Sequence, residues 1–310
     1  MALPRRRNKL TLLLEAAIFL AVALLAAIPA RADWRDGMGT FRIGIVLPSD
    51  GTFARERLEG FRALVSEVLA MPVEIFPARD GSALIDAVAT SRVEYAVFSA
   101  LAYATASELC ECVEPLAAPV NREGASAVRS VLVADGAKVA HIGDLAGLPV
   151  AIGPRDSLGG DMLPAAGFRW QGRPLAQSGL DLRRVETTQE ALRMLADGEV
   201  AAAFVWEFVR PGSAAVFAGG PRAYLEELAP DRFAVMWRSQ AVRFGPHAVR
   251  RNLPHEAKAA LRRALAGLAL GHPDVLDGIS PELGGGFEIV TADEYRSALA
   301  LVAAISASGE

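Results

Sequence analysis

Cysteine is scarce in this sequence, which has only Cys110 and Cys112 among its 310 residues. Two thiolates are too few for the four-ligand shell of a structural zinc ion, and no histidine lies near them in the sequence. Side chains two residues apart in an extended strand point to opposite faces, so a mutual disulfide would require a distorted backbone. We therefore interpret the pair as structural or weakly redox-active, rather than as a metal or catalytic pair.

Recognised catalytic signatures are also missing. The sequence contains no GxxxxGK[ST] phosphate loop, no GxSxG nucleophile elbow and no HExxH zinc motif. All four histidines fall outside the loops expected at the strand ends, and His247 in "FGPHAV" is interpreted as a loop or hinge residue. Ser99 and Ser157 consequently lack a matched base. We expect no enzymatic activity, no catalytic or metal-binding residue and no cofactor.

The composition describes a chain with a large core and a weak negative charge. Hydrophobic residues make up 52% and charged residues 22% of the sequence, so the chain can bury enough apolar surface to fold as two lobes. The first 32 residues hold five basic and one acidic residue, which leaves 27 basic and 35 acidic residues, a formal net charge of −8, in the remainder. A clustered basic face is missing, so nucleic acid is not an expected partner.

The N-terminus has the pattern of an export signal. The basic start "MALPRRRNK" precedes an apolar stretch at 16–30, and Ala30-Arg31-Ala32 has the small-x-small form of a cleavage site. We assign residues 1–32 to a signal peptide. The alternative is an uncleaved anchor, since counting back to Leu10 gives about 21 residues interrupted only by Glu15. In both cases the rest of the chain would lie outside the cytoplasm, in the periplasm.

Strands and helices then alternate along the chain. "FRIGIVLP", "VEIFPA" and "YAVFSA" have the apolar character of buried strands, and the segments between them place apolar residues on one helical face. This order predicts an open α/β sheet with helices on both faces, and residues 33–125 are assigned to the first part of lobe 1.

The pattern begins again in residues 126–242, which are assigned to lobe 2. Its strand candidates are "RSVLVAD", "LPVAIG", "LRRVET", "AAAFVW" and "FAVMWRSQAV". Residues 243–310 show only helix-like segments, with "GGG" at 284–286 read as a flexible turn, so these helices are expected to return to lobe 1. The predicted fold is α/β, with two open doubly wound sheets joined by a hinge.

Seven segments, taken in order, resemble one known family. They are "FRIGIVLP", "VEIFPARDGSALIDAVATSRVEYAVFSALAYATA", "VEPLAAPVNREG", "SVLVA", "DLAGLPVAIGPRDSLGG", "EALRMLADGEVAAAF" and "WRSQAVRFGPHAVRRNLP". Over nearly all of residues 41–300 the chain resembles the phosphate/phosphite/phosphonate group of periplasmic substrate-binding proteins of ABC transporters. The resemblance implies the bilobal periplasmic-binding-protein fold, capture of a small-molecule ligand by hinge closure, and delivery of that ligand to an ABC permease in the inner membrane. We expect the protein to be a monomer.

Ligands of open α/β sheets bind beyond the carboxyl ends of the strands. Besides the strand-end loop Pro48–Phe53, the candidate ligand-binding residues are Arg79, Ser99, Tyr103, Ser157, Leu158, Gly159, Gly160, Thr188, Trp206 and Glu207.

The candidate site departs from the family pattern. Members that hold a phosphonate typically have a Ser-Thr-Ser-Gly turn where this chain has Ser157 to Gly160, so one hydroxyl of three remains, and Thr188 stands in place of a common histidine. Asp156 and Asp161 flank the turn, and one carboxylate about 4 Å from a phosphonate would oppose binding by about 4 kcal/mol at an effective dielectric of ~20. Asp161 is interpreted as the cap of a helix that starts at Met162.

Two further interpretations stay open at this stage. Trp206 and Glu207, read as following a strand, would suit a cationic or hydroxylated ligand rather than a phosphonate. The same fold also serves as a ligand-sensing periplasmic domain that partners a membrane signalling protein. The leading hypothesis is a periplasmic binding protein of an ABC importer, with a phosphonate-, phosphite- or phosphate-like ligand.

Overall fold

The computed structural model describes residues 33–47, 52–213, 215 and 217–308. The predicted signal peptide and most of the loop Pro48–Phe53 lie outside the described residues. The short helix α2 (Trp34–Met38) belongs to a unit formed by residues 1–39, and residues 40–310 form a second compact unit. Among the helices that the structure describes, none combines the length and the apolar character needed to cross a membrane.

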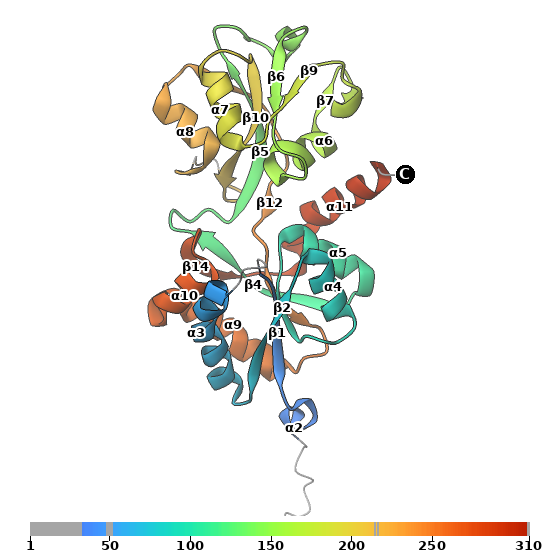
Figure 1. Cartoon of the computed structure of the whole chain (residues 1–310), viewed down its shortest axis with the longest axis vertical. Coiled ribbons are helices and arrows are strands. Elements are labelled where there is room, and N and C mark those ends of the chain that lie inside the picture. Colours follow the sequence, from blue (N-terminus) through green and yellow to red (C-terminus); the bar gives the residue numbers. More distant parts are fainter. Residues whose placement is uncertain (1–32, 48–51, 214, 216, 309–310) are drawn as a thin grey trace, which may run out of the picture. The chain divides into compact units, whose positions relative to one another are not determined.

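The second unit contains two large sheets (Figure 1). In the first sheet the strand order is β14-β4-β13-β3-β1-β2, with β1 parallel to β2 and β3, and β13 antiparallel to β3 and β4. The bounds are β1 (Phe41–Val46), β2 (Val73–Ala78), β3 (Tyr95–Val97), β4 (Val113–Asn121), β13 (His247–Arg250) and β14 (Gly284–Ile289). Two groups of helices pack with it: α3 (Thr52–Leu69), α9 (His255–Gly271) and α10 (Pro273–Ile279), and α4 (Gly81–Ala89), α5 (Ala100–Cys110) and α11 (Arg296–Ser308).

The second sheet has the order β11-β5-β10-β6-β9, and β12 also pairs with β5. Its strands are β5 (Ala127–Asp135), β6 (Pro149–Ile152), β9 (Asp181–Arg184), β10 (Ala202–Val209), β11 (Phe233–Arg238) and β12 (Val242–Arg243). Around it lie α6 (Leu163–Gly167), α7 (Thr188–Ala196), α8 (Gly220–Leu228), the hairpin β7 (Arg169–Trp170) and β8 (Arg173–Pro174), and the short helices η1 (Ile142–Leu145), η2 (Leu158–Met162) and η3 (Leu175–Gln177). The predicted α/β fold with two open sheets is confirmed.

The two faces of the second sheet bury different side chains. Aliphatic residues of α7 and α8, such as Leu195 and Leu225, pack against one face of the sheet. On the other face Phe168, Phe204 and Trp237 meet edge to face, with ring centroids 5.1 to 6.0 Å apart. Because both faces of the sheet are covered, a ligand reaches it at the strand ends or along its edges, and the site candidates were placed at the strand ends.

The strands β13 and β14 were missed by the sequence analysis. The "GGG" segment is the start of β14 rather than a flexible turn, and it pairs with β4 through a register shift between Gly284 and Phe287. A Cβ on Gly285 would lie 2.0 Å from the carbonyl oxygen of Asn121, so only glycine allows this close approach of the two strands. A strand that begins without side chains leaves no alternating pattern to detect.

The interpretation of His247 as a loop or hinge residue was wrong. His247 lies in β13 with 2% of its surface exposed, and its Nδ1 is 2.6 Å from the Tyr95 hydroxyl. The imidazole ring meets Phe61 and Phe287 edge to face at 5.9 and 4.7 Å. Complete burial lowers the pKa of His247 to about 3, so this histidine is a neutral part of the first core.

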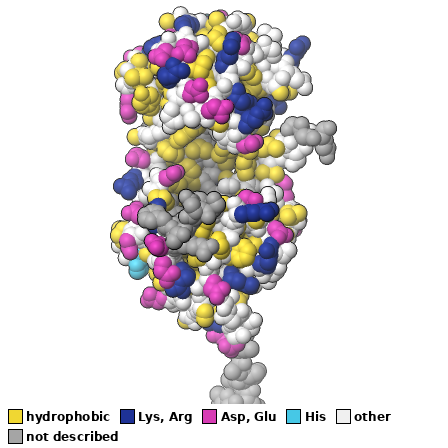
Figure 2. Space-filling view, in the orientation of Figure 1, with side chains coloured by type: hydrophobic (Ala, Val, Ile, Leu, Met, Phe, Trp, Pro, Cys, Tyr) yellow, Lys and Arg dark blue, Asp and Glu magenta, His cyan; other side chains and the backbone are white. Residues whose placement is uncertain are grey.

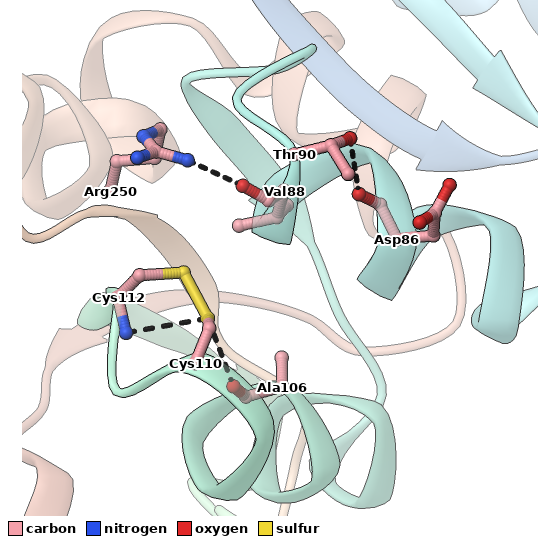
Figure 3. The surroundings of a disulfide bond; sticks show 7 residues. All are labelled: Asp86, Val88, Thr90, Ala106, Cys110, Cys112 and Arg250. Carbon is pink, nitrogen blue, oxygen red and sulfur yellow. Dashed lines mark hydrogen bonds between the residues drawn. A yellow bond between two sulfur atoms is a disulfide. The ribbon is translucent and has the colours of Figure 1, made fainter.

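The two cysteines form a disulfide, contrary to the expectation from an extended chain (Figure 3). Cys110 is the last residue of α5, and Glu111 ends the helix in the left-handed conformation with φ 48°. This turn brings the side chains of Cys110 and Cys112 to the same side, with the Cα atoms 5.0 Å apart. The extended backbone assumed in the sequence analysis is therefore replaced by a helix end.

The disulfide closes a loop of only three residues, so it restricts the unfolded chain very little. We expect the double variant C110S/C112S to lower the free energy of unfolding by about 1.5 kcal/mol, less than a disulfide that closes a long loop contributes. Urea denaturation without reductant would measure the difference. A loss above about 4 kcal/mol would show that the bond holds together more than the end of α5.

Ion pairs connect the region where the chain crosses between the sheets. Glu288 of β14 accepts hydrogen bonds from Arg210, which follows β10, at 2.7 Å and from Arg243 of β12 at 3.0 Å. Arg243 also pairs with Glu294 of the short helix η4 (Ala292–Tyr295) at 2.8 Å. Burial favours a higher pKa for Glu288, but the two arginines outweigh it and hold this pKa below its ordinary value. Both sheets thus contribute charges to one network.

Candidate functional site

The turn after β6 is folded back on itself. The Gly153 N–H donates to the Gly160 carbonyl at 2.9 Å, and the Ser157 hydroxyl donates to the Pro154 carbonyl at 2.7 Å. A Cβ on Gly160 would lie 2.9 Å from both the Gly153 Cα and the Ser157 Oγ, so a larger residue would open the turn. The one hydroxyl that survives from the family pattern is therefore used inside the turn, and the backbone is left as its principal hydrogen-bonding surface.

The expectation that Asp161 caps a helix starting at Met162 was wrong. Helical backbone already begins at Leu158, in the π-helical turn η2, so Asp161 lies inside the helical segment and Met162 caps α6. The Asp161 carboxylate instead accepts the Asp156 N–H at 3.0 Å and a hydrogen bond from Arg184 at 2.9 Å. This ion pair compensates one of the two carboxylates that flank the turn.

Arg184 contacts the turn and was not among the candidate residues of the sequence analysis. It is the last residue of β9, and its guanidinium donates both to Asp161 and, at 2.7 Å, to the Gly153 carbonyl. The Arg184 side chain thereby connects Gly153 with Asp161 and compensates the negative charge of the Asp161 carboxylate. In the sequence, Arg184 lies inside the strand candidate "LRRVET", and no signal distinguishes it there from a solvated arginine.

The backbone of this turn presents N–H groups at the end of a strand. The first N–H groups of a helix have no partner inside the helix, and the Ser157 side chain makes no capping bond to them. Leu158, at the start of η2, packs against the hydrophobic cluster that contains Phe98, Tyr103 and Tyr295. Leu158 therefore contributes apolar contact, while its backbone belongs to the N-terminal turn.

Tyr103 is a core residue rather than a surface one. It is 1% exposed, and its ring lies 4.8 Å from Tyr295 and 6.4 Å from Phe98. Burial raises the pKa of the Tyr103 phenol. Tyr103 therefore packs in the core against Phe98, the residue that directly follows β3.

At the strand ends of the first sheet, polar side chains cap helices. The Ser99 hydroxyl accepts the Ala102 N–H at 3.1 Å at the start of α5, and the Asp80 carboxylate accepts the Ala83 N–H at 2.7 Å at the start of α4. Arg79 is paired with Asp80 at 3.1 Å, and 85% of the Arg79 side chain is exposed. Its exposed guanidinium makes it the residue of this group that is free to reorient toward an anion.

Trp206 and Glu207 lie within β10, not after it as the sequence analysis expected. Neighbouring residues of a strand point to opposite faces, so the two side chains diverge. Glu207 is 4% exposed and accepts a hydrogen bond from Arg129 at 2.6 Å, with Arg238 at 3.6 Å. Its carboxylate is therefore already paired, contrary to the role considered for a cationic ligand.

Trp206 connects the turn to a pocket of about 800 Å³ between α7 and α8. Thr188, the first residue of α7, lines the same pocket, while Thr187 caps the helix by accepting the Glu190 N–H at 3.1 Å. A Cβ on Gly159 would lie 2.6 Å from the Trp206 Cβ. Among the candidates, the structure thus brings Gly159, Trp206 and Thr188 together.

The described residues form no metal cluster, and the face drawn in Figure 2 does not carry charge of a single sign. Within the described residues no three His, Cys, Asp or Glu side chains lie together as metal ligands would. Basic and acidic side chains are interspersed over the described part of the face in Figure 2. The turn and its surroundings provide backbone N–H donors, an apolar platform at Trp206 and an acid, Asp161, that is paired with Arg184.

A family model for the phosphonate periplasmic substrate-binding protein of ABC transporters matches residues 43–295. The chain belongs to this family. The family comprises the substrate-binding components of ABC transporters, which implies a periplasmic location, a small-molecule ligand and a permease partner. It is a transport family of solute-binding proteins rather than a family of enzymes.

The solved structures of two other proteins have a similar fold. PhnD1 from Prochlorococcus marinus, in complex with methylphosphonate, shares 13% identity with a TM-score of 0.52, over 86% of this chain and 98% of that chain. XAC2383 from Xanthomonas citri, bound to chloride ion, shares 15% identity with a TM-score of 0.55, over 87% and 98% of the two chains. The latter protein has also been solved bound to ATP. At these identities the likeness concerns the fold.

Proposed function

We propose that this protein is the binding component of an ABC importer for a phosphonate-, phosphite- or phosphate-like oxyanion. The ligand would bind between two lobes, lobe 1 formed by residues 33–125 and 243–310 and lobe 2 by residues 126–242, and closure about the hinge would trap it. The protein would act as a monomer, with residues 1–32 as its signal peptide. The observation that carries the proposal is the turn Ser157 to Gly160, whose flanking Asp161 is neutralised by Arg184.

The electrostatic balance at the turn supports an anionic ligand. A helix N-terminus stabilises an anion by about 0.3 to 1 kcal/mol, and up to about 2 kcal/mol when partly buried. An uncompensated carboxylate nearby would outweigh that gain, but the Asp161 carboxylate is hydrogen-bonded to Arg184 and to the Asp156 N–H. Arg155 in the turn and Arg79 at the end of β2 are both exposed and would add positive charge.

Ligand screening tests the proposed function. Thermal unfolding and calorimetric titration with phosphate, phosphite and methylphosphonate should reveal a stabilising ligand, because a ligand that binds only the folded state raises its stability. Methanesulfonate, which has a similar shape but carries one charge, would serve as the comparison. If none of the phosphorus oxyanions binds, the proposed ligand class is wrong.

We predict that G160A weakens oxyanion binding by about tenfold, since each 1.4 kcal/mol changes an affinity by that factor. The added Cβ would displace Gly153 or Ser157 and open the turn. The matched control is G267A, because Gly267 in α9 has no atom within 4 Å of a Cβ. Titration with the best ligand from the screen measures both variants, and equal affinities for G160A and wild type would contradict the role of the turn.

A further inference from the structure

The pocket between α7 and α8 is larger than a small oxyanion needs. Its volume is about 800 Å³, in the range that proteins use for ligands of roughly 300 to 1,000 Å³. Leu192 of α7 and Pro221, Tyr224 and Leu228 of α8 contribute apolar surface to its walls. Tyr224 and Leu228 are 52% and 50% exposed, so both side chains offer apolar surface to a ligand in the pocket.

Trp206 extends from the oxyanion turn into this pocket. Its Cβ lies against Gly159 of the turn, and its ring edge lies against Gly220 at the start of α8, where an added Cβ would be 2.8 Å from Cζ3. The ring also meets Phe208 edge to face at 5.0 Å. Two glycines and a second aromatic ring therefore hold the indole in one position, as a rigid platform that begins at the turn and ends in the pocket.

The charged residues that line the pocket, Arg193 and Asp197, are already paired. Arg193 donates to Asp197 at 3.3 Å and to Glu199 at 2.6 Å, so the wall does not offer an uncompensated charge at Arg193. A second ionic group on the ligand would have to displace these pairs. An uncharged substituent would cover Tyr224, Leu228 and the indole without that cost.

We propose that the ligand is an oxyanion with an aromatic or bulky apolar substituent. Its anionic head lies at the turn Ser157 to Gly160, and its substituent lies on Trp206 in the pocket between α7 and α8. This inference rests on the proposed function, and it narrows the ligand class from simple phosphonates to organophosphonates with an apolar body. Trp206, Tyr224 and Leu228 then determine specificity.

Calorimetric titration of the mature protein, residues 33–310, with methylphosphonate and benzylphosphonate tests the inference. The benzyl compound should bind at least about tenfold more tightly, because its ring is removed from water on the indole. In L228E and Y224S the ratio of the two affinities should fall toward one. The matched control is L270E, since Leu270 in α9 is 96% exposed and far along the chain from the pocket, and it should keep the wild-type ratio.

The outcomes separate the inference from the proposed function. Equal affinities for the two phosphonates in the wild type would overturn the inference and leave the proposed function intact. A preference for the benzyl compound that survives in both L228E and Y224S would also overturn it, because the ring would then lie elsewhere. Absence of binding by both compounds would overturn the inference, and it would overturn the proposed function as well only if phosphate and phosphite also fail to bind.

Discussion

The protein is expected to lose stability as the pH falls below about 6.5, and the variant H247N is expected to lose less. The reference pKa of histidine is about 6.5, whereas burial lowers the pKa of His247 to about 3 in the folded state. Between these values the unfolded chain binds a proton that the folded chain does not. The free energy of unfolding therefore falls with decreasing pH, by up to about 1.4 kcal/mol per pH unit from this residue.

Urea denaturation at several pH values between 7 and 4 would measure this effect. Carboxylates also contribute to acid destabilisation, but they are the same in both proteins, so the difference in slope isolates His247. Asparagine retains a polar partner for the Tyr95 hydroxyl and does not titrate. The control is H255N, at an exposed histidine that opens α9. Identical slopes in H247N and the wild type would show that His247 is protonated in the folded protein.

The position of His247 shows where the fold was predictable from sequence and where it was not. Most strands of both sheets up to β11 follow apolar runs, with helical periodicity or turns between them, whereas the short strands β9 and β12 contain charged residues. β13 and β14 lack that signal, because β13 has four residues after a proline and β14 begins with three glycines. Only pairing with β3 and β4 makes them strands, and pairing between distant segments leaves no local pattern.

The location of the turn after β6 was predictable from the sequence, but the hydrogen-bond partners of its acidic residues were not. The turn follows β6, as the sequence analysis expected, and Gly159 in this turn packs against Trp206. The partners of the acids were not identifiable, because Arg184 is 23 residues from Asp161 along the chain. The same limit applies to Glu207, whose partner Arg129 lies 78 residues away on the neighbouring strand.

The directions in which the Trp206 and Tyr103 side chains point could not be predicted from the sequence either. A residue near a strand end lies at the surface or in the core according to the register of the strand and the helix that covers it. Tyr103 lies on the inner face of α5, and Trp206 faces the turn. The sequence analysis had placed both simply as aromatic residues near strand ends. The backbone conformation of Glu111 decides the pairing of the cysteines in the same way.

Replacing Arg184 should affect ligand binding more than any other single change in the turn. In R184A the Asp161 carboxylate would be left without its cation, and the Gly153 carbonyl would lose its donor. We expect the affinity for methylphosphonate, or for the best oxyanion found by screening, to fall about 100-fold, which corresponds to about 2.7 kcal/mol. This is less than the repulsion of about 4 kcal/mol between two charges 4 Å apart at an effective dielectric of 20.

A second variant distinguishes charge from geometry in that loss. The double variant D161N/R184A removes the carboxylate together with its partner, so it should recover much of the affinity if repulsion causes the loss, and little if the shape of the turn does. The matched control is R183A, because Arg183 is the neighbouring residue of β9 and pairs with Asp181 at the exposed surface. Calorimetric titration of the three variants measures the effect. If R184A binds the ligand with wild-type affinity, Arg184 is not part of the ligand site. The Asp161 carboxylate would then lie too far from the ligand to oppose its binding.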